Sequence, residues 1–187
     1  MQRQNLGQWR PFRSRFGALA AIAILLTCAV LAGWLDEAGS PVSGRPRISD
    51  GDSFHLGADR IRLLGIDAPE LDQTCTDADS RNWPCGRAAR DKLVDLVAAQ
   101  SLTCQPDGHD RFGRILAICS AGGRDLGLQM VAAGLAVSAD DYGREEAAAR
   151  VARRGLWAGT FDLPRAWRDA HGREAEANAP WSWLPGL

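Results

Sequence analysis

The chain has 187 residues, of which 45% are hydrophobic and 24% charged, a balance that is typical of a globular protein and excludes a disordered or fibrous chain. Residues 1–35 hold four arginines and no acid, so 18 of the 22 basic residues remain against all 23 acidic ones, a formal charge of −5. A domain of this charge has no overall attraction for nucleic acid, and binding would have to rest on a local cleft.

The N-terminus has the pattern of a membrane-targeting segment. Residues 1–15 carry arginines and no acid, and residues 16–35 follow as twenty residues without a charge. Twenty such residues match a bilayer crossing better than the shorter core of a cleaved signal peptide, so we expect a transmembrane anchor with the arginines inside and the rest of the chain extracytoplasmic. Cleavage after Ala32, which would give a secreted protein, is the alternative. Residues 36–47 are expected to form a linker.

A β-hairpin is predicted within residues 50–70, which read DGDSFHLGADRIRLLGIDAPE. Two β-rich runs, at 53–56 and 61–66, are separated by a short turn that contains Gly, the usual pattern of a hairpin. Pro69 has no backbone N–H to donate to a neighbouring strand, so it ends the second run.

The ends of these two strands carry the residues that indicate chemistry. Asp52 precedes the first strand and Asp67 ends the second, so the two carboxylates can approach each other and offer the oxygen ligands that Ca²⁺ or Mg²⁺ requires. Glu70 follows in a loop, where it can act as general base on a water beside the metal. Arg62 lies inside an apolar strand and needs a carboxylate or phosphate partner, because an unpaired buried charge is costly.

A helix and a second hairpin are predicted next. Residues 86–99 place apolar side chains on one face at helical spacing. Short β-rich runs at 102–104 and 115–119 then form a hairpin.

The loop of this second hairpin, at 107–113, supplies two further arginines. Arg111 lies within the loop, and Arg114 enters the strand that follows it. Arg62 and Arg114 thus offer two guanidinium forks, which together with a divalent cation would stabilise the negative charge of a phosphoryl-transfer transition state.

Two more helices are predicted at 125–133 and 144–154, each followed by a glycine, Gly134 and Gly155. Residues 173–187 are polar and then Trp- and Pro-rich, and are expected to form a flexible tail.

Four cysteines follow the apolar segment: Cys75, Cys85, Cys104 and Cys119. Their spacing lacks the close pairs of a zinc site, so disulfides in an oxidising compartment are the preferred interpretation. Proximity favours Cys75 with Cys85 and Cys104 with Cys119, although four cysteines allow three pairings.

Taken together, four motifs resemble the staphylococcal nuclease, or thermonuclease, family. They are DGDS at 50–53, RLLGIDAPE at 62–70, DRFGR at 110–114 and GLW at 155–157, in this order. The resemblance covers about residues 48–172 as one domain. It implies an α+β fold, a five-stranded OB-type β-barrel with about three helices. It also implies calcium-dependent cleavage of DNA and RNA that leaves 3′-phosphate ends.

Matched by position, the resemblance assigns roles to the residues already singled out. It implies that Asp52 and Asp67 bind the metal, that Glu70 is the base, and that Arg62 and Arg114 hold the phosphate. It implies Ca²⁺ as the metal, since oxygen ligands alone do not decide between hard cations.

Departures from the family pattern concern the substrate contacts. Phe112 replaces a common Tyr, and two tyrosines near the nucleotide in the family enzyme correspond to Asp140 and Tyr142. Arg111 and Tyr142 are the expected substrate contacts, and DNA and RNA the expected substrates of a monomeric enzyme.

Two other classes of protein remain alternatives. One is a catalytically inactive OB-type module that only binds nucleic acid, and the other is a membrane-tethered interaction domain. The complete set of two metal acids, one base and two arginines favours the enzyme, because a binding module has no need for all five.

Overall fold

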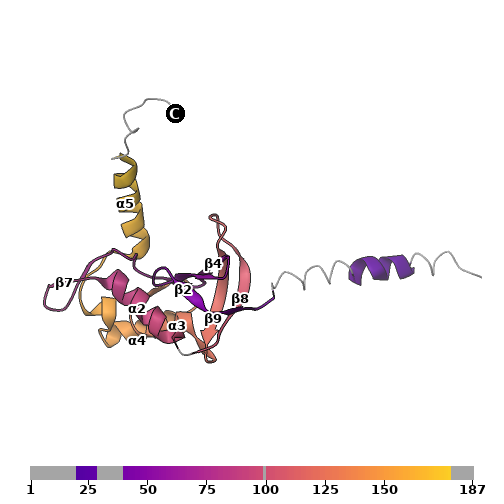
Figure 1. The fold of residues 1–187 in the computed structure, drawn as a ribbon, viewed down its shortest axis with the longest axis horizontal. Helices are drawn as coiled ribbons and strands as arrows, with labels where there is room; N and C mark the ends of the chain where they lie inside the picture. The colour runs from indigo at the N-terminus through magenta and orange to yellow at the C-terminus, as the bar shows by residue number, and fades with distance from the viewer. Residues whose placement is uncertain (1–19, 29–39, 99, 178–187) are drawn as a thin grey trace, which may run out of the picture. The chain divides into compact units, whose positions relative to one another are not determined.

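The computed structural model describes residues 20–28, 40–98 and 100–177 (Figure 1). Residues 20–28 are helical and belong to a first compact unit, Met1–Glu37, while the rest forms a second unit, Ala38–Leu187. Most of the anchor expected at 16–35, and most of the tail expected at 173–187, lie outside the described residues. In the part of the chain that the structure describes, no helix has both the length and the apolar character that a membrane crossing needs.

The second unit is built on a strongly curved sheet. Its strands follow the order β1-β8-β9-β4-β3-β2, with β10 paired to β9. Their bounds are Val42–Gly44 (β1), Pro46–Ile48 (β2), Ser53–Leu56 (β3), Asp59–Leu63 (β4), Leu102–His109 (β8), Ile115–Ala121 (β9) and Arg124–Asp125 (β10).

The connection between β1 and β2 shows that this sheet is nearly closed. The two strands lie at opposite ends of the strand order, yet only Arg45 separates them in the chain. One residue spans a few ångströms, so the two edges must come together, as they do in a barrel. Gly44 of β1 accordingly lies against the side chain of Leu56 in β3.

This arrangement confirms the barrel-type α+β fold and corrects two details. The sheet has seven strands where five were predicted. Two of them, β1 and the start of β2, lie in residues 36–47, where a linker was predicted. The short strands lack strong apolar alternation, and they form because the edges of β8 and β3 offer unpaired backbone groups.

The first predicted hairpin is present, but its second strand breaks early. β3 and β4 pair antiparallel with Ser53 opposite Arg62, and β4 then runs parallel to β9. Gly65 has a φ of 79°, which a strand residue with a side chain rarely adopts, so the chain turns there. The short strand β5 (Ile66–Asp67) does not continue β4 and instead pairs with β11 (Val137–Ser138).

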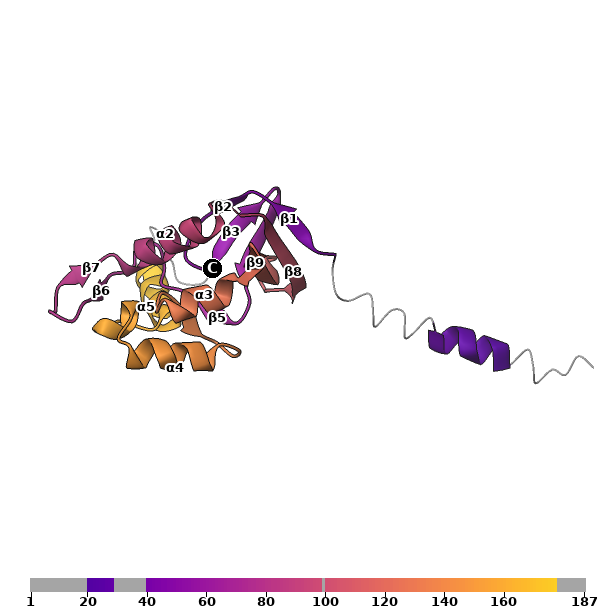
Figure 2. The same cartoon turned by 90° about the horizontal axis from the view of Figure 1, so that it is seen from below.

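The predicted helices are confirmed as α2 (Cys85–Val97), α3 (Leu126–Ala132) and α4 (Gly143–Val151). Asp125 caps α3 by accepting the backbone N–H of Leu128, and residues of α2 and α3 share one apolar core with the barrel strands. Figure 2 shows these helices on one side of the strands. A short 3-10 helix (η1, Gly155–Ala158) and a further helix, α5 (Pro164–Ala177), complete the described chain.

Both predicted disulfides are confirmed, between Cys75 and Cys85 and between Cys104 and Cys119. The second pair joins β8 to β9 inside the barrel core, since the two cysteines are direct cross-strand partners. The first pair belongs to a separate small cluster with Leu156. It links α2 to the hairpin of β6 (Cys75–Thr76) and β7 (Asn82–Trp83).

Candidate active site

The acidic turn before β3 fixes the most buried carboxylate of the site. Asp50 accepts the backbone N–H groups of Asp52 and Ser53 at 3.0 and 2.6 Å, so the turn is held by its own first residue. Asp52, only 3% exposed, accepts the Ala68 N–H at 3.0 Å on one oxygen and the Ser53 hydroxyl at 2.7 Å on the other. The turn therefore directs Asp52 inward, toward the end of β4.

Arg62 joins the two acids that were predicted to bind metal. Its Nη1 donates to Asp52 Oδ1 at 2.9 Å, and its Nη2 donates to Asp67 Oδ1 at 2.8 Å. The guanidinium side chain is 17% exposed. The predicted need of Arg62 for a carboxylate partner is thus confirmed, and the carboxylates of Asp52 and Asp67 converge on one point.

A second arginine, Arg168 of α5, completes the charge network. Its Nη1 lies 3.0 Å from Asp67 Oδ1 and 2.8 Å from Glu70 Oε1, and its Nη2 lies 3.1 Å from Asp67 Oδ2. Burial by itself would lower the pKa of Arg168, but the hydrogen bonds and charges of Asp67 and Glu70 raise it, so the side chain stays protonated.

Sequence reasoning missed Arg168 because α5 was not predicted. The signal available was modest, namely two arginines three residues apart, Arg165 and Arg168, which occupy one face if the segment is helical. The segment follows the last family motif, so no motif drew attention to it.

Arg114 is held by the turn that precedes it. Asp110 accepts the backbone N–H groups of Phe112 and Arg114, each at 2.9 Å, and also accepts Arg114 Nε at 2.7 Å. Burial would raise the pKa of Asp110, but these hydrogen bonds and the charge of Arg114 lower it to about 2. One guanidinium nitrogen of Arg114 reaches the Ser53 hydroxyl at 3.3 Å, which brings the second hairpin to the first.

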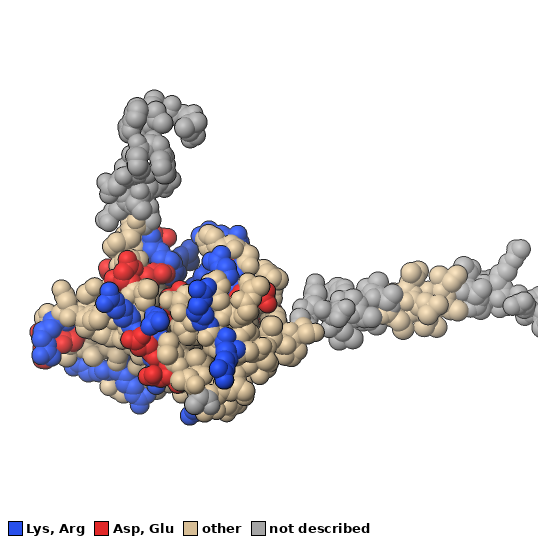
Figure 3. Space-filling model, viewed as in Figure 1, with Lys and Arg blue, Asp and Glu red and all other residues tan. Residues whose placement is uncertain are grey.

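These side chains open into a cleft of about 1080 Å³ between the barrel and α5. Figure 3 shows acidic and basic side chains gathered where α5 meets the barrel. Arginines outnumber acids among the lining residues, which are Asp50, Arg60, Arg62, Glu70, Asp110, Arg111, Phe112, Arg114, Leu116, Arg165, Arg168 and Asp169. The cleft therefore has the positive character that the whole domain lacks, which suits an anionic substrate.

Of the two predicted substrate contacts, the structure brings one to the cleft. Arg111 lines it, with its guanidinium carbon 4.7 Å from the centre of the Phe112 ring. Tyr142 is 8% exposed and donates its hydroxyl to Asp125, at 3.0 Å to the nearer oxygen. Burial and that carboxylate raise its pKa, and its ring packs beside Gly127, away from the residues that line the cleft.

The charge balance of the acids suits a divalent cation. When all three are ionised, the carboxylates of Asp52, Asp67 and Glu70 share two guanidinium groups, which leaves one negative charge uncompensated. Burial raises the pKa of Asp52 to about 7, although the charge of Arg62 acts to lower it. No group of three or more potential ligands (His, Cys, Asp or Glu) comes together among the described residues, so substrate and water oxygens would have to complete the coordination.

Comparison with known proteins agrees with this geometry. The model of the family described as "Staphylococcal nuclease homologue" matches residues 60–159, more than half of the chain. A micrococcal nuclease of Shigella flexneri is 29% identical over 193 residues, covering 91% of this chain and 94% of the relative.

Two other relatives cover most of the chain. An uncharacterized endonuclease of Escherichia coli is 30% identical over 148 residues, which is 73% of this chain and 80% of the relative. A succinoglycan biosynthesis protein, ExoI, of Rhizobium meliloti is 29% identical over 159 residues, 81% and 83% of the two chains. The predicted enzyme class, a nuclease, is confirmed, and this chain belongs to the staphylococcal nuclease family.

Proposed function

We propose that this protein is a calcium-dependent phosphodiesterase that cleaves DNA and RNA and leaves 3′-phosphate ends. The observation that carries the proposal is the convergence of Arg62, Arg114 and Glu70 on one cleft, with Asp52 and Asp67 directly behind it. Family membership supports the same reading.

The side chains divide the reaction between them. Glu70 takes a proton from the attacking water, whose oxygen bonds to phosphorus as the bond from phosphorus to the 5′ oxygen breaks. The departing 5′ oxygen takes a proton from solvent and leaves as a hydroxyl group. Arg62 and Arg114 donate to the phosphate oxygens as their charge increases, and Arg111 binds the neighbouring backbone. Asp52 and Asp67 would hold Ca²⁺, which supplies positive charge at the scissile phosphate when bound.

The Arg62 contacts support a site that substrate and metal share. Both terminal guanidinium nitrogens of Arg62, Nη1 and Nη2, are engaged by carboxylates. A cation held by the same carboxylates would neutralise them and leave the arginine free to donate to phosphate.

The first test is digestion of single-stranded DNA and of RNA by the oxidised full-length protein, in Ca²⁺ and in chelator. Glu70→Gln and Arg114→Ala should each lower kcat about 100-fold or more, because each removes a group used in the transition state. Arg124→Ala is the matched control, an exposed arginine of β10 outside the cleft, and should cleave at the wild-type rate. End-labelling of the products identifies the 3′-phosphate.

The metal is tested separately by calorimetry. Ca²⁺ should bind the wild type, and Asp67→Asn should weaken that binding, because a neutral amide is a poorer ligand for a hard cation. A folded, oxidised wild type that cuts neither substrate with any divalent metal would contradict the enzyme and leave the nucleic-acid-binding module as the reading to test.

A further inference from the structure

We propose that Arg168 is a positioning residue for Glu70, so that the C-terminal helix α5 is part of the active site. The role rests on the proposed function of Glu70 as general base. Arg168 acts by holding the carboxylates of Glu70 and Asp67. It lies in a segment that follows all the family motifs.

The contact geometry separates this role from that of a simple positive charge. Nη1 of Arg168 is shared between Asp67 Oδ1 at 3.0 Å and Glu70 Oε1 at 2.8 Å, while Nη2 binds the other oxygen of Asp67 at 3.1 Å. A planar guanidinium whose two terminal nitrogens are both engaged fixes the orientation of the bound carboxylates as well as their distance. Without it, the two carboxylates would repel each other and Glu70 would be free to rotate toward solvent.

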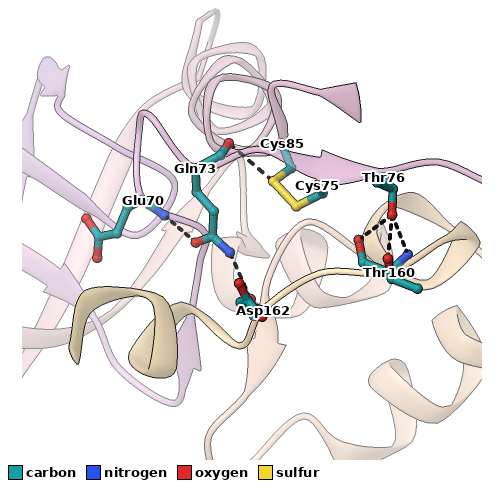
Figure 4. The surroundings of a disulfide bond; sticks show 7 residues. All are labelled: Glu70, Gln73, Cys75, Thr76, Cys85, Thr160 and Asp162. Atoms are coloured by element: carbon teal, nitrogen blue, oxygen red, sulfur yellow. Dashed lines mark hydrogen bonds between the residues drawn. A yellow bond between two sulfur atoms is a disulfide. The ribbon is translucent and has the colours of Figure 1, made fainter. Parts of the chain in front are cut away.

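The backbone around Glu70 is tied to the start of α5 by a second set of contacts (Figure 4). Gln73 is 1% exposed; its side-chain oxygen accepts the Glu70 N–H at 3.2 Å, and its side-chain nitrogen donates to the Asp162 carbonyl at 2.8 Å. Asp162 lies two residues before α5 begins at Pro164. The loop that carries the base and the helix that carries Arg168 are therefore held to each other by one buried amide.

The adjacent disulfide fixes the other end of this loop. Cys75 is bonded to Cys85 at the start of α2, and the Gln73 carbonyl accepts the backbone N–H of Gly86 at 3.2 Å. Thr76 exchanges backbone hydrogen bonds with Thr160, at 2.9 and 3.2 Å. The loop from Glu70 to Thr76 is thus fixed to both helices, and a side chain from α5 can hold Glu70 in a defined position.

Arg165 provides a comparison within the same helix. It lies one turn before Arg168 and lines the same cleft, but it is exposed and forms no ion pair among the described residues. Removing Arg165 deletes the same charge from the same element without releasing Glu70. Comparing variants of the two arginines therefore separates the positioning of Glu70 from the attraction of the substrate.

The kinetic test compares Arg168→Gln with Arg165→Gln in the full-length, oxidised protein on single-stranded DNA. Arg168→Gln should lower kcat at least 10-fold with KM changed less than threefold, because a misplaced base slows the chemical step. Arg165→Gln should raise KM and keep kcat, because a positive charge in the cleft attracts substrate. Guanidinium ion at millimolar concentration should partly restore kcat to Arg168→Ala and leave Arg165→Ala unchanged.

A second readout does not depend on activity. Arg168→Gln should speed amide hydrogen exchange at Ala68, Glu70 and Gln73 several-fold, while Arg165→Gln exchanges like the wild type. If the wild type shows no nuclease activity, the proposed function fails and this measurement still decides the role of Arg168. If Arg168→Gln does not fold, Arg168→Lys, which keeps the charge and loses the fork, takes its place in both tests.

Either of two results would overturn the proposal. One is an Arg168→Gln enzyme that retains kcat within twofold of wild type or loses affinity alone, as Arg165→Gln should. The other is unchanged hydrogen exchange around Glu70 in a folded Arg168 variant.

Discussion

Asp110 is the residue whose contacts determine the direction of Arg114. It binds the backbone and the Nε of the arginine at once, and leaves a guanidinium nitrogen of Arg114 to reach Ser53. The sequence motif DRFGR thus combines Arg114, the proposed phosphate contact, with the carboxylate that orients it. The same hydrogen bonds lower the pKa of Asp110 to about 2.

This lowered pKa predicts a pH dependence of stability. A carboxyl group whose folded pKa lies below its unfolded value stabilises the fold above the unfolded pKa, and that contribution disappears as the pH falls through the folded one. Asp110→Asn should therefore lower the free energy of unfolding at pH 7 by about 1 kcal/mol, and the difference from wild type should vanish between pH 4 and pH 2. Urea unfolding across this range measures it. A difference that is constant with pH would show that the charge of Asp110 contributes nothing.

At the scale of elements, the start of α2 determines where the Glu70 loop can lie. A Cβ built on Gly86 would stand 1.7 Å from the Glu70 carbonyl oxygen, so the loop packs directly on the backbone of the helix. This contact permits the Gln73 hydrogen bonds that hold the base. The missing side chain at Gly86 is thus what lets the loop that carries Glu70 pack against the helix.

Gly86→Ala is expected to destabilise the protein and slow catalysis together. The added methyl group must push the loop away, at a cost of about 1–3 kcal/mol, and Glu70 moves with it. Gly143→Ala is the matched control, since Gly143 also lies in the first turn of a helix but its added Cβ would meet nothing within 4 Å. Thermal unfolding and kcat measured on both variants test this. Equal unfolding temperatures for the two would refute the packing argument.

For the whole molecule, the two disulfides have different consequences. Cys104–Cys119 joins two strands that already pair along much of their length, whereas Cys75–Cys85 fixes the loop beside the base and α5. Both constrain the unfolded chain, but only Cys75–Cys85 lies in the chain segment that follows Glu70, which lines the cleft.

Removing each disulfide by a pair of Cys→Ala substitutions should separate these effects. Cys104–Cys119 closes a 15-residue loop and should add about 3 kcal/mol to the free energy of unfolding, and Cys75–Cys85, which closes a shorter loop, should add slightly less. The Cys75→Ala, Cys85→Ala protein should nevertheless lose more kcat than the Cys104→Ala, Cys119→Ala protein at a temperature where both are folded. Similar kcat values for the two would contradict the role of the first disulfide at the site.

Local patterns in the sequence were enough to predict most of the local elements and to single out Arg62, Glu70 and Arg114, which line one cleft. Turn residues and apolar periodicity predicted the two hairpins and the helices α2, α3 and α4, because these features depend on neighbours a few residues apart. The partner of Arg62 was also predictable in kind, since a buried charge requires an opposite one. Cysteine spacing favoured the observed pairing.

The positions of β1, β2 and α5 depend instead on packing between segments that are far apart in the sequence. The closing strands β1 and β2 follow from edges offered by strands elsewhere in the sequence, and Tyr142 turned to Asp125 because packing beside Gly127 buried its ring. Arg168 contacts Glu70 and Asp67 across separations of 98 and 101 residues, and its helix contains none of the family motifs that could have predicted the contact. Contacts of this kind are created by packing, and no local pattern in the sequence encodes them.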